Sequence, residues 1–188
     1  MMRIITGKAK GIRLKTLEGD TTRPTAERVK EAVFSMLQFD LEGRAVLDLF
    51  AGSGQLGLEA LSRGAAHAVL VDKSKAAIKI IEENAIKTKL ALECTIKLSD
   101  AMDYLRRNRG TKFDIIFLDP PYAAGLYAPT LRLMLECQIL KPTSLIVCES
   151  DTEEIFAGDM LLAERFEIQK TSKYSKTVIT VLSPKEEE

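Results

Sequence analysis

The stretch DLFAGSGQLGLEAL, residues 48–61, decides the fold because it passes from strand character to helical character through a glycine-rich turn. The apolar run AVLDLF at residues 45–50 leads into the turn, and a segment of helical period follows it. Gly52, Gly54 and Gly57 match the spacing G-x-G-x-x-G, in which glycines let the backbone turn sharply and approach a ligand. The helix that follows offers unpaired N–H groups to that ligand. The glycine spacing alone is also compatible with a purely structural turn.

Short apolar runs alternate with segments of helical period along most of the chain. The runs that we predict as strands are residues 45–50, 67–72, 93–98, 113–119 and 144–150. The segments of helical period between them are centred on residues 56–61, 76–85 and 126–135. This alternation is typical of βαβ units and of a mostly parallel sheet. Residues 166–182 instead predict two strands joined by a polar turn, which would close the domain as an antiparallel hairpin.

The composition predicts one soluble globular domain. The chain has 188 residues, of which 46% are hydrophobic and 29% charged. No apolar run is long enough to span a membrane, and the first residues, MMRIITGKAKGIR, do not resemble an export signal. Cys94, Cys137, Cys148 and the single histidine, His67, do not show metal-ligand spacing. We therefore expect a cytoplasmic protein with reduced thiols and without a bound metal.

Acidic residues stand at the ends of three successive predicted strands: Asp48, Asp72 and Asp100. The carboxyl ends of parallel strands share one edge of the sheet, and open α/β sheets bind their ligands there. The pattern predicts a ligand that contains a nucleoside. Asp48 beside the glycines would repel a pyrophosphate but attract a sulfonium and an ammonium group. A dinucleotide-dependent oxidoreductase is an alternative, supported by the glycine spacing and Asp72 alone.

The segment FDIIFLDPPY, residues 113–122, ends a predicted strand with an acid, two prolines and a tyrosine. The amine of a base is a poor nucleophile because its lone pair is delocalised into the ring. Two acceptors aimed at its N–H groups, the Asp119 carboxylate and the Pro120 carbonyl, would localise that pair and stabilise the developing positive charge. Pro120 and Pro121 would hold the acceptors rigidly, and Tyr122 could stack on an extruded base. The segment therefore predicts methyl transfer to the amine of a base.

The N-terminal part of the chain is basic although the net charge of the whole chain is zero. Residues 1–30 carry eight Lys and Arg against three Asp and Glu. Such asymmetry indicates a polyanionic partner, with a solvated basic surface as the alternative. The segment around Gly7 and Gly11 predicts a β-hairpin, and residues 23–37 predict a helix with Thr25 as its N-cap.

These motifs resemble a known family. AGSG at residues 51–54 together with DPPY at 119–122 resembles the S-adenosylmethionine-dependent amino-methyltransferases that act on bases. The additional segments GKAKG, RPTAERVKEAVFSML and VDKS, in this order, are similar to bacterial small-subunit (16S) ribosomal RNA guanine-N2 methyltransferases. The similarity extends from Arg3 to about Thr180.

The resemblance implies the class I methyltransferase fold, a Rossmann-like sheet of seven strands with helices on both faces and an antiparallel last hairpin. It implies S-adenosyl-L-methionine as the methyl donor, S-adenosylhomocysteine as the product, and no metal. Donor binding is implied for Asp48, Gly52, Ser53, Gly54, Asp72, Lys73, Asp100 and Ala101. Catalysis is implied for Asp119, Pro120, Pro121 and Tyr122, and contact with RNA for Lys8, Lys10, Arg13, Arg23 and Thr25. The implied partner is small-subunit ribosomal RNA, within a ribosomal particle and away from membranes.

We divide the chain into an RNA-binding hairpin arm at residues 1–22, a methyltransferase domain at 23–183 and a disordered tail at 184–188. Two residues depart from the family pattern: Gln55 replaces a small residue and Ser175 replaces a glycine. An adenine-N6 methyltransferase of DNA or RNA is the closest alternative, because DPPY serves adenine as well. Those enzymes usually carry a separate target-reading domain, for which this chain has no room.

Overall fold

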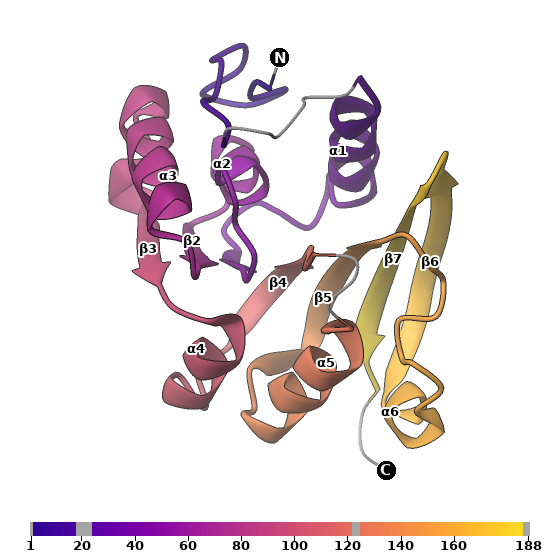
Figure 1. Ribbon diagram of the computed structural model, residues 1–188. Coiled ribbons are helices and arrows are strands. Elements are labelled where there is room, and N and C mark those ends of the chain that lie inside the picture. The colour runs from indigo at the N-terminus through magenta and orange to yellow at the C-terminus, as the bar shows by residue number, and fades with distance from the viewer. Residues whose placement is uncertain (1, 18–23, 122–124, 186–188) are drawn as a thin grey trace.

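The centre of the molecule is one seven-stranded sheet with the strand order β3-β2-β1-β4-β5-β7-β6 (Figure 1). The computed structural model describes residues 2–17, 24–121 and 125–185, and only the backbone of residues 24–26. The first five strands are parallel, whereas β7 runs antiparallel to β5 and β6 antiparallel to β7. This topology confirms the predicted fold class. The strands are β1 (Ala45–Asp48), β2 (His67–Asp72), β3 (Cys94–Leu98), β4 (Phe113–Leu118), β5 (Leu140–Ser150), β6 (Phe166–Tyr174) and β7 (Thr177–Pro184).

Helices cover both faces of the sheet (Figure 1). One apolar core contains residues of α1, α2 and α3, and the other contains residues of α4, α5 and α6. Successive strand residues alternate between the two cores, as Val46 and Leu47 of β1 do. None of the described helices is long and apolar enough to cross a membrane. The helices are α1 (Pro24–Met36), α2 (Gln55–Ser62), α3 (Lys75–Thr88), α4 (Ala101–Arg107), α5 (Tyr127–Glu136) and α6 (Met160–Glu164), with a 3₁₀ turn at Ala91–Glu93.

A buried acid ties the amino ends of the central strands together. Asp114 of β4 accepts hydrogen bonds from the backbone N–H of Ala45 at 2.9 Å, from Lys141 Nζ at 2.8 Å and from Arg44 Nη1 at 3.2 Å. Burial raises the pKa of the Asp114 carboxyl, but the hydrogen bonds from Lys141, Ala45 and Arg44 outweigh burial and hold this pKa below its ordinary value. These hydrogen bonds connect β1, β4 and β5 at the amino edge of the sheet.

Three predictions differ from the structure at element boundaries. The helix α1 begins at Pro24, so the prediction of Thr25 as its N-cap is wrong. Proline suits the first helical position because its fixed φ is helical and its missing N–H would have no partner there. The N-terminal hairpin is reduced to one isolated antiparallel bridge between Arg3 and Arg13, and no described strand forms in this segment. The strand predicted at residues 144–150 is longer in the structure and begins at Leu140. Its pairing with β4 is irregular between Phe113 and Ile115.

The strand β6 forms one edge of the sheet and exposes most of its side chains, including Lys170 and Lys173. A two-residue turn joins it to β7, with Tyr174 paired to Thr177. The first turn residue, Ser175, has φ 59°, a left-handed conformation that favours glycine. A positive φ at this position is typical of a type II′ hairpin turn. This conformation explains why glycine is expected at position 175.

We therefore expect Ser175→Gly to stabilise the protein by about 0.5 kcal/mol, because glycine adopts a positive φ without a steric penalty. The measurement is the urea midpoint of unfolding for both proteins. Ser172→Gly is the matched control, since glycine within the extended strand β6 should lower the midpoint. Equal effects of the two substitutions would contradict the assignment of strain to Ser175.

Candidate active site

A cavity of about 440 Å³ lies at the carboxyl edge of the sheet. The strand β1 is the point at which the order of the sheet reverses, because β2 pairs on one side of it and β4 on the other. Such a switch point opens a crevice in α/β sheets, and ligands bind there. The lining residues come from the ends of β1, β2, β3 and β4 and from the N-terminal segment: Leu17, Leu49, Phe50, Gly52, Asp72, Lys73, Ser99, Asp100, Ala101, Asp119, Pro120, Pro121 and Leu126.

The glycine turn between β1 and α2 forms one wall of this cavity. Gly52 and Gly54 have φ of 55° and 79°, so both positions need the left-handed conformation that glycine tolerates best. A Cβ atom built on Gly52 would meet no atom within 4 Å, which leaves room for a ligand against this residue. A Cβ atom on Gly57 would lie 2.9 Å from Leu70 Cγ. Gly57 therefore serves the packing of α2 against β2 and does not face the cavity.

Asp72 and Asp100 line the cavity and also fix the backbone around it. Asp72 accepts from the N–H of Gly52 at 2.9 Å through one oxygen and from the N–H of Ser74 at 2.8 Å through the other. Asp100 caps α4 by accepting from the N–H groups of Met102 at 2.9 Å and Asp103 at 3.3 Å. A carboxylate has about four lone-pair sites, so both acids can accept further hydrogen bonds from a ligand hydroxyl or amine.

Asp48 lies directly behind the glycine turn and is fully buried. One carboxyl oxygen accepts from the N–H of Gly57 at 3.2 Å. The other oxygen, Oδ1, is buried and has no hydrogen-bond partner among the described residues. Burial raises the pKa of Asp48 to about 7, against the hydrogen bonds from Gly57 and Phe50 that lower it. A buried acid with an unused oxygen favours a cationic group nearby and disfavours a phosphate.

The motif that follows β4 forms the facing part of the cavity lining. Asp119, Pro120 and Pro121 all line the cavity, with Pro120 buried and Pro121 exposed. Because β4 pairs with β1, this segment and the glycine turn leave neighbouring strands at the same edge. Tyr122, which completes the motif, lies outside the described residues.

The structure thus brings most of the predicted donor and catalytic residues to one cavity and places three of them behind it. Asp48, Ser53 and Gly54 support the turn from the core side, where the Ser53 hydroxyl donates to Met2 Sδ at 3.3 Å. Gln55 begins α2 and does not line the cavity. The cavity residues that the sequence analysis missed are Leu17, Leu49, Phe50, Ser99 and Leu126. Leu49 and Ser99 adjoin motif acids and Phe50 directly precedes the AGSG motif, but Leu17 had no signal in the sequence.

Much of the basic N-terminal charge is paired. Arg3 contacts Glu27 at 2.7 Å, Lys8 contacts Glu93 at 2.6 Å, and Lys15 pairs with Glu83. Lys10 and Arg13 are exposed and form no ion pair with any described residue. Arg23 lies outside the described residues, as does the end of the predicted tail at residues 186–188, and for Thr25 only the backbone is described. The RNA-binding role of residues 1–22 stays a prediction.

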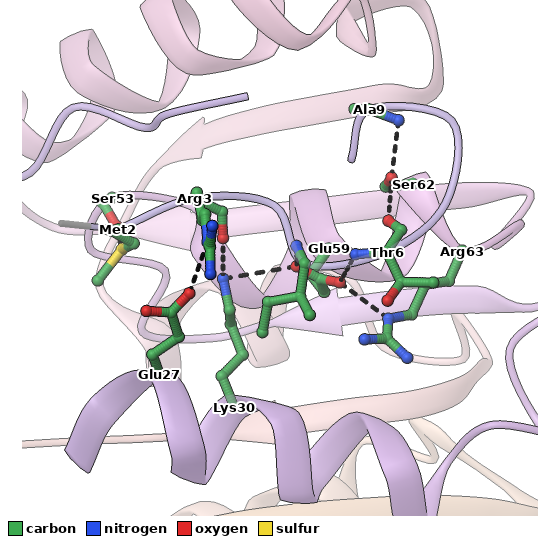
Figure 2. A network of polar contacts seen from close by, with 11 residues as sticks. Met2, Arg3, Thr6, Ala9, Glu27, Lys30, Ser53, Glu59, Ser62 and Arg63 are labelled. Atoms are coloured by element: carbon green, nitrogen blue, oxygen red, sulfur yellow. Dashed lines mark hydrogen bonds and ion pairs between the residues drawn. The ribbon is translucent and has the colours of Figure 1, made fainter. Parts of the chain in front are cut away.

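A buried polar network attaches the N-terminal segment to α1 and α2 (Figure 2). Glu59 of α2 accepts from the N–H groups of Ile5 at 2.7 Å and Thr6 at 3.0 Å, and from Arg63 Nε at 2.8 Å. Lys30 of α1 lies 3.5 Å from Glu59 and donates to the carbonyl of Arg3 at 2.5 Å. Burial lowers the pKa of Lys30, partly offset by Glu59. An acid within the otherwise apolar face of α2 was the available sequence signal for this anchor.

Comparison with known proteins shows the family. A family model described as "Conserved hypothetical protein 95" matches residues 2–183. Ribosomal RNA small subunit methyltransferase D of Escherichia coli (strain K12) is 38% identical over 152 residues, which cover 81% of this chain and 76% of that protein. The chain belongs to this methyltransferase family. YlbH of Bacillus subtilis is 42% identical over 169 residues, covering 87% and 92% of the two chains.

Solved structures that are similar to this chain support the same family assignment. The structure of yhhF from Escherichia coli superposes with a TM-score of 0.85 at 31% identity and covers 99% of both chains. The structure of HI0767 from Haemophilus influenzae gives a TM-score of 0.81 at 28% identity, covering 98% and 99% of the chains. The resemblance to small-subunit ribosomal RNA methyltransferases and the predicted fold are both confirmed.

The buried acid behind the glycine turn predicts a pH dependence of stability. The pKa of Asp48 is about 7 in the folded protein against an ordinary value of 3.8. Its stabilising contribution is complete below the lower value and is lost as the pH rises through the higher one. Since one pH unit corresponds to about 1.4 kcal/mol, the loss between these limits is about 4 kcal/mol.

Asp48→Asn should remove this loss, because an amide carries no charge at either pH. We expect the free energy of unfolding of the variant, from urea titrations at pH 5 and pH 8 without ligand, to decline less than that of the natural protein. Asp103→Asn, at an exposed acid of α4, is the control and should keep the original decline. An undiminished decline in Asp48→Asn would contradict the assignment.

Proposed function

We propose that this protein transfers a methyl group from S-adenosyl-L-methionine to the exocyclic N2 amine of a guanine in small-subunit ribosomal RNA. The observation that carries the proposal is a single cavity lined at once by the glycine turn, by Asp72 and Asp100, and by Asp119-Pro120-Pro121. The relatives named as ribosomal RNA small subunit methyltransferase D support RNA methylation. Membership of that family and the acceptor pair of the motif support the amine of guanine.

The chemistry of the cavity suits this methyl donor better than a dinucleotide. The carboxylates of Asp72 and Asp100 line the cavity, and the buried acid Asp48 lies directly behind the glycine turn. They favour a ligand with positive charge and ribose hydroxyls, and they oppose a pyrophosphate. In this proposal Asp72 holds the ribose hydroxyls, Asp100 and Ala101 border the adenine, and Gly52 leaves room for the methionine part. Lys73 lines the same wall. When bound, the donor supplies an electrophilic methyl group on a sulfonium.

The motif after β4 supplies the acceptors that make an aromatic amine nucleophilic. The Asp119 carboxylate and the Pro120 carbonyl accept hydrogen bonds from the two N–H groups of the amine in this proposal. They localise the nitrogen lone pair and stabilise the positive charge that develops there. The two prolines fix their own φ angles, so the acceptors do not need to reorganise during the reaction. Stacking of the base on Tyr122 is part of the proposal.

The exposed cations of the N-terminal segment give RNA a place to bind beside the cavity. Lys10 and Arg13 are exposed, and Leu17 of the same segment lines the cavity. In the proposal these two cations contact phosphates, Lys8 assists them, and Arg23 and Thr25 lie near the target nucleotide.

Asp119→Asn should reduce methyl transfer by about 100-fold or more, because an amide cannot supply the negative charge that stabilises the developing cation. Binding of S-adenosylhomocysteine should change little. The assay is transfer of labelled methyl groups to small ribosomal subunits from cells that lack this protein, with Asp103→Asn as the control. Unchanged transfer by Asp119→Asn would refute the catalytic assignment.

The labelled product of the same assay identifies the target base. Digestion to nucleosides and mass spectrometry should yield N2-methylguanosine. N6-methyladenosine would favour the adenine alternative, and absence of label from a folded, donor-binding protein would refute the proposal.

The double substitution Lys10→Glu and Arg13→Glu should weaken RNA binding by about tenfold or more and flatten its dependence on salt, because fewer phosphate contacts release fewer counterions. Donor affinity measured without RNA should stay unchanged. The matched control is Arg109→Glu with Lys185→Glu, two exposed cations at the amino edge of the sheet. Equal weakening by both pairs would mean that net charge alone, and not this segment, governs the binding.

A further inference from the structure

The side chain of Asn84 is fully buried within α3, yet all of its polar atoms have partners. Its Oδ1 accepts from the N–H of Lys15 at 2.8 Å, and its Nδ2 donates to the carbonyl of the same residue at 3.0 Å. The second hydrogen of Nδ2 is directed to the carbonyl of Ser53 at 2.9 Å. One amide thus joins three segments that are distant in sequence: residues 15–17, the glycine turn and α3.

Two of these segments are walls of the candidate active site. Ser53 stands between Gly52 and Gly54, whose left-handed conformations define the glycine turn. Lys15 is two residues before Leu17, which lines the cavity from the N-terminal segment. Because one buried amide holds both backbone groups of Lys15 and the carbonyl of Ser53, a displacement of residues 15–17 is transmitted to the glycine turn. Asn84 therefore sets the spacing between two walls of the cavity without lining it.

The N-terminal segment has a buried inner side and an exposed outer side. Its inner side is anchored by Ile4, Ala9 and Leu14, which are all buried in the core shared with α1, α2 and α3. Its outer side carries the exposed Lys10 and Arg13. A single ordered segment thus lies between the surface proposed for RNA and the cavity proposed for the donor.

We propose that Asn84 is a positioning residue that couples RNA binding to donor binding. The proposal rests on the proposed function, since it takes RNA on the outer side of the segment and donor in the cavity. A donor in the cavity holds the glycine turn and, through Asn84, favours the placement of residues 15–17 seen in the structure, and RNA on the same segment favours that placement too. Each ligand then raises the affinity for the other by the same factor, as thermodynamic linkage requires.

An amide is the group that this position needs. Aspartate would direct a carboxylate at the carbonyls of Lys15 and Ser53, which would then lose their donor and be repelled. Alanine would remove the hydrogen-bond partner that Asn84 provides to the partly buried N–H of Lys15 and to both carbonyls. Either change frees the segment, including Leu17, from the glycine turn, while the other residues that line the cavity are unaltered.

The test measures the affinity for S-adenosylhomocysteine with and without small ribosomal subunits from cells that lack this protein. In the natural protein we expect the subunits to raise the affinity about fivefold or more, within the usual range of coupling. In Asn84→Ala we expect the affinity without subunits to fall about tenfold and the ratio of the two affinities to approach one. Asn108→Ala is the matched control, because the amide of Asn108 donates only to Tyr104 within α4.

A ratio near one in the natural protein, with both ligands bound, would overturn the coupling and leave the proposed function intact. An unchanged ratio in Asn84→Ala would overturn the role of Asn84. Failure of the natural protein to bind S-adenosylhomocysteine, or to bind the subunits, would refute the proposed function itself and the coupling with it.

Hydrogen exchange on the natural protein tests the same link if Asn84→Ala does not fold. Binding of S-adenosylhomocysteine should slow exchange of the Lys15 amide, which donates to Asn84, more than exchange of the Leu162 amide, which donates to Asp159 in α6. Equal protection of the two amides would overturn the proposal.

Discussion

The rest of the molecule depends on the pairing of β1 with β4 in the centre of the sheet. Both strands are buried on both faces, and Val46, Leu47 and Asp48 pair with Ile115, Ile116 and Phe117 in parallel register. This register brings the glycine turn and Asp119 to the same edge. The chain leaves the two strands toward opposite faces of the sheet, through α2 after β1 and through α5 after β4. The cavity lies between the segment that joins β1 to α2 and the segment that joins β4 to α5.

The sequence predicted the sheet well because its strands are short apolar runs between helices of clear period. All five predicted parallel strands and the final hairpin are present, and the acids Asp72, Asp100 and Asp119 lie around one cavity as expected. Such features are local, since a strand end and a glycine turn follow from the residues that form them. The N-cap of α1 was predicted wrongly because Pro24 offers an equally local signal for the first helical position.

What the sequence could not predict depends on contacts between distant segments. Leu17 lines the cavity, and Lys15, two residues before it, is bound by Asn84, which lies 69 positions after Lys15 in the sequence. Asp48 adjoins the glycine motif in the sequence, but only the fold shows that it is buried behind the turn, where burial raises its pKa to about 7. The basic excess of the first 30 residues indicated a polyanionic partner, and the sequence could not show that several of these cations are paired with acids of the domain. A buried ion pair such as Lys30 with Glu59 specifies how the segment sits rather than adding much net stability.

The two outer strands of the sheet carry a further consequence. An open sheet leaves unpaired backbone groups on its outermost strands, and a second copy of a protein can add to them and start a fibre. Here β3 exposes Lys97 and β6 exposes Glu167, Lys170 and Lys173 at these positions. Burying such charges against a neighbouring copy would be costly, so these side chains oppose edge-to-edge pairing of two copies of the sheet.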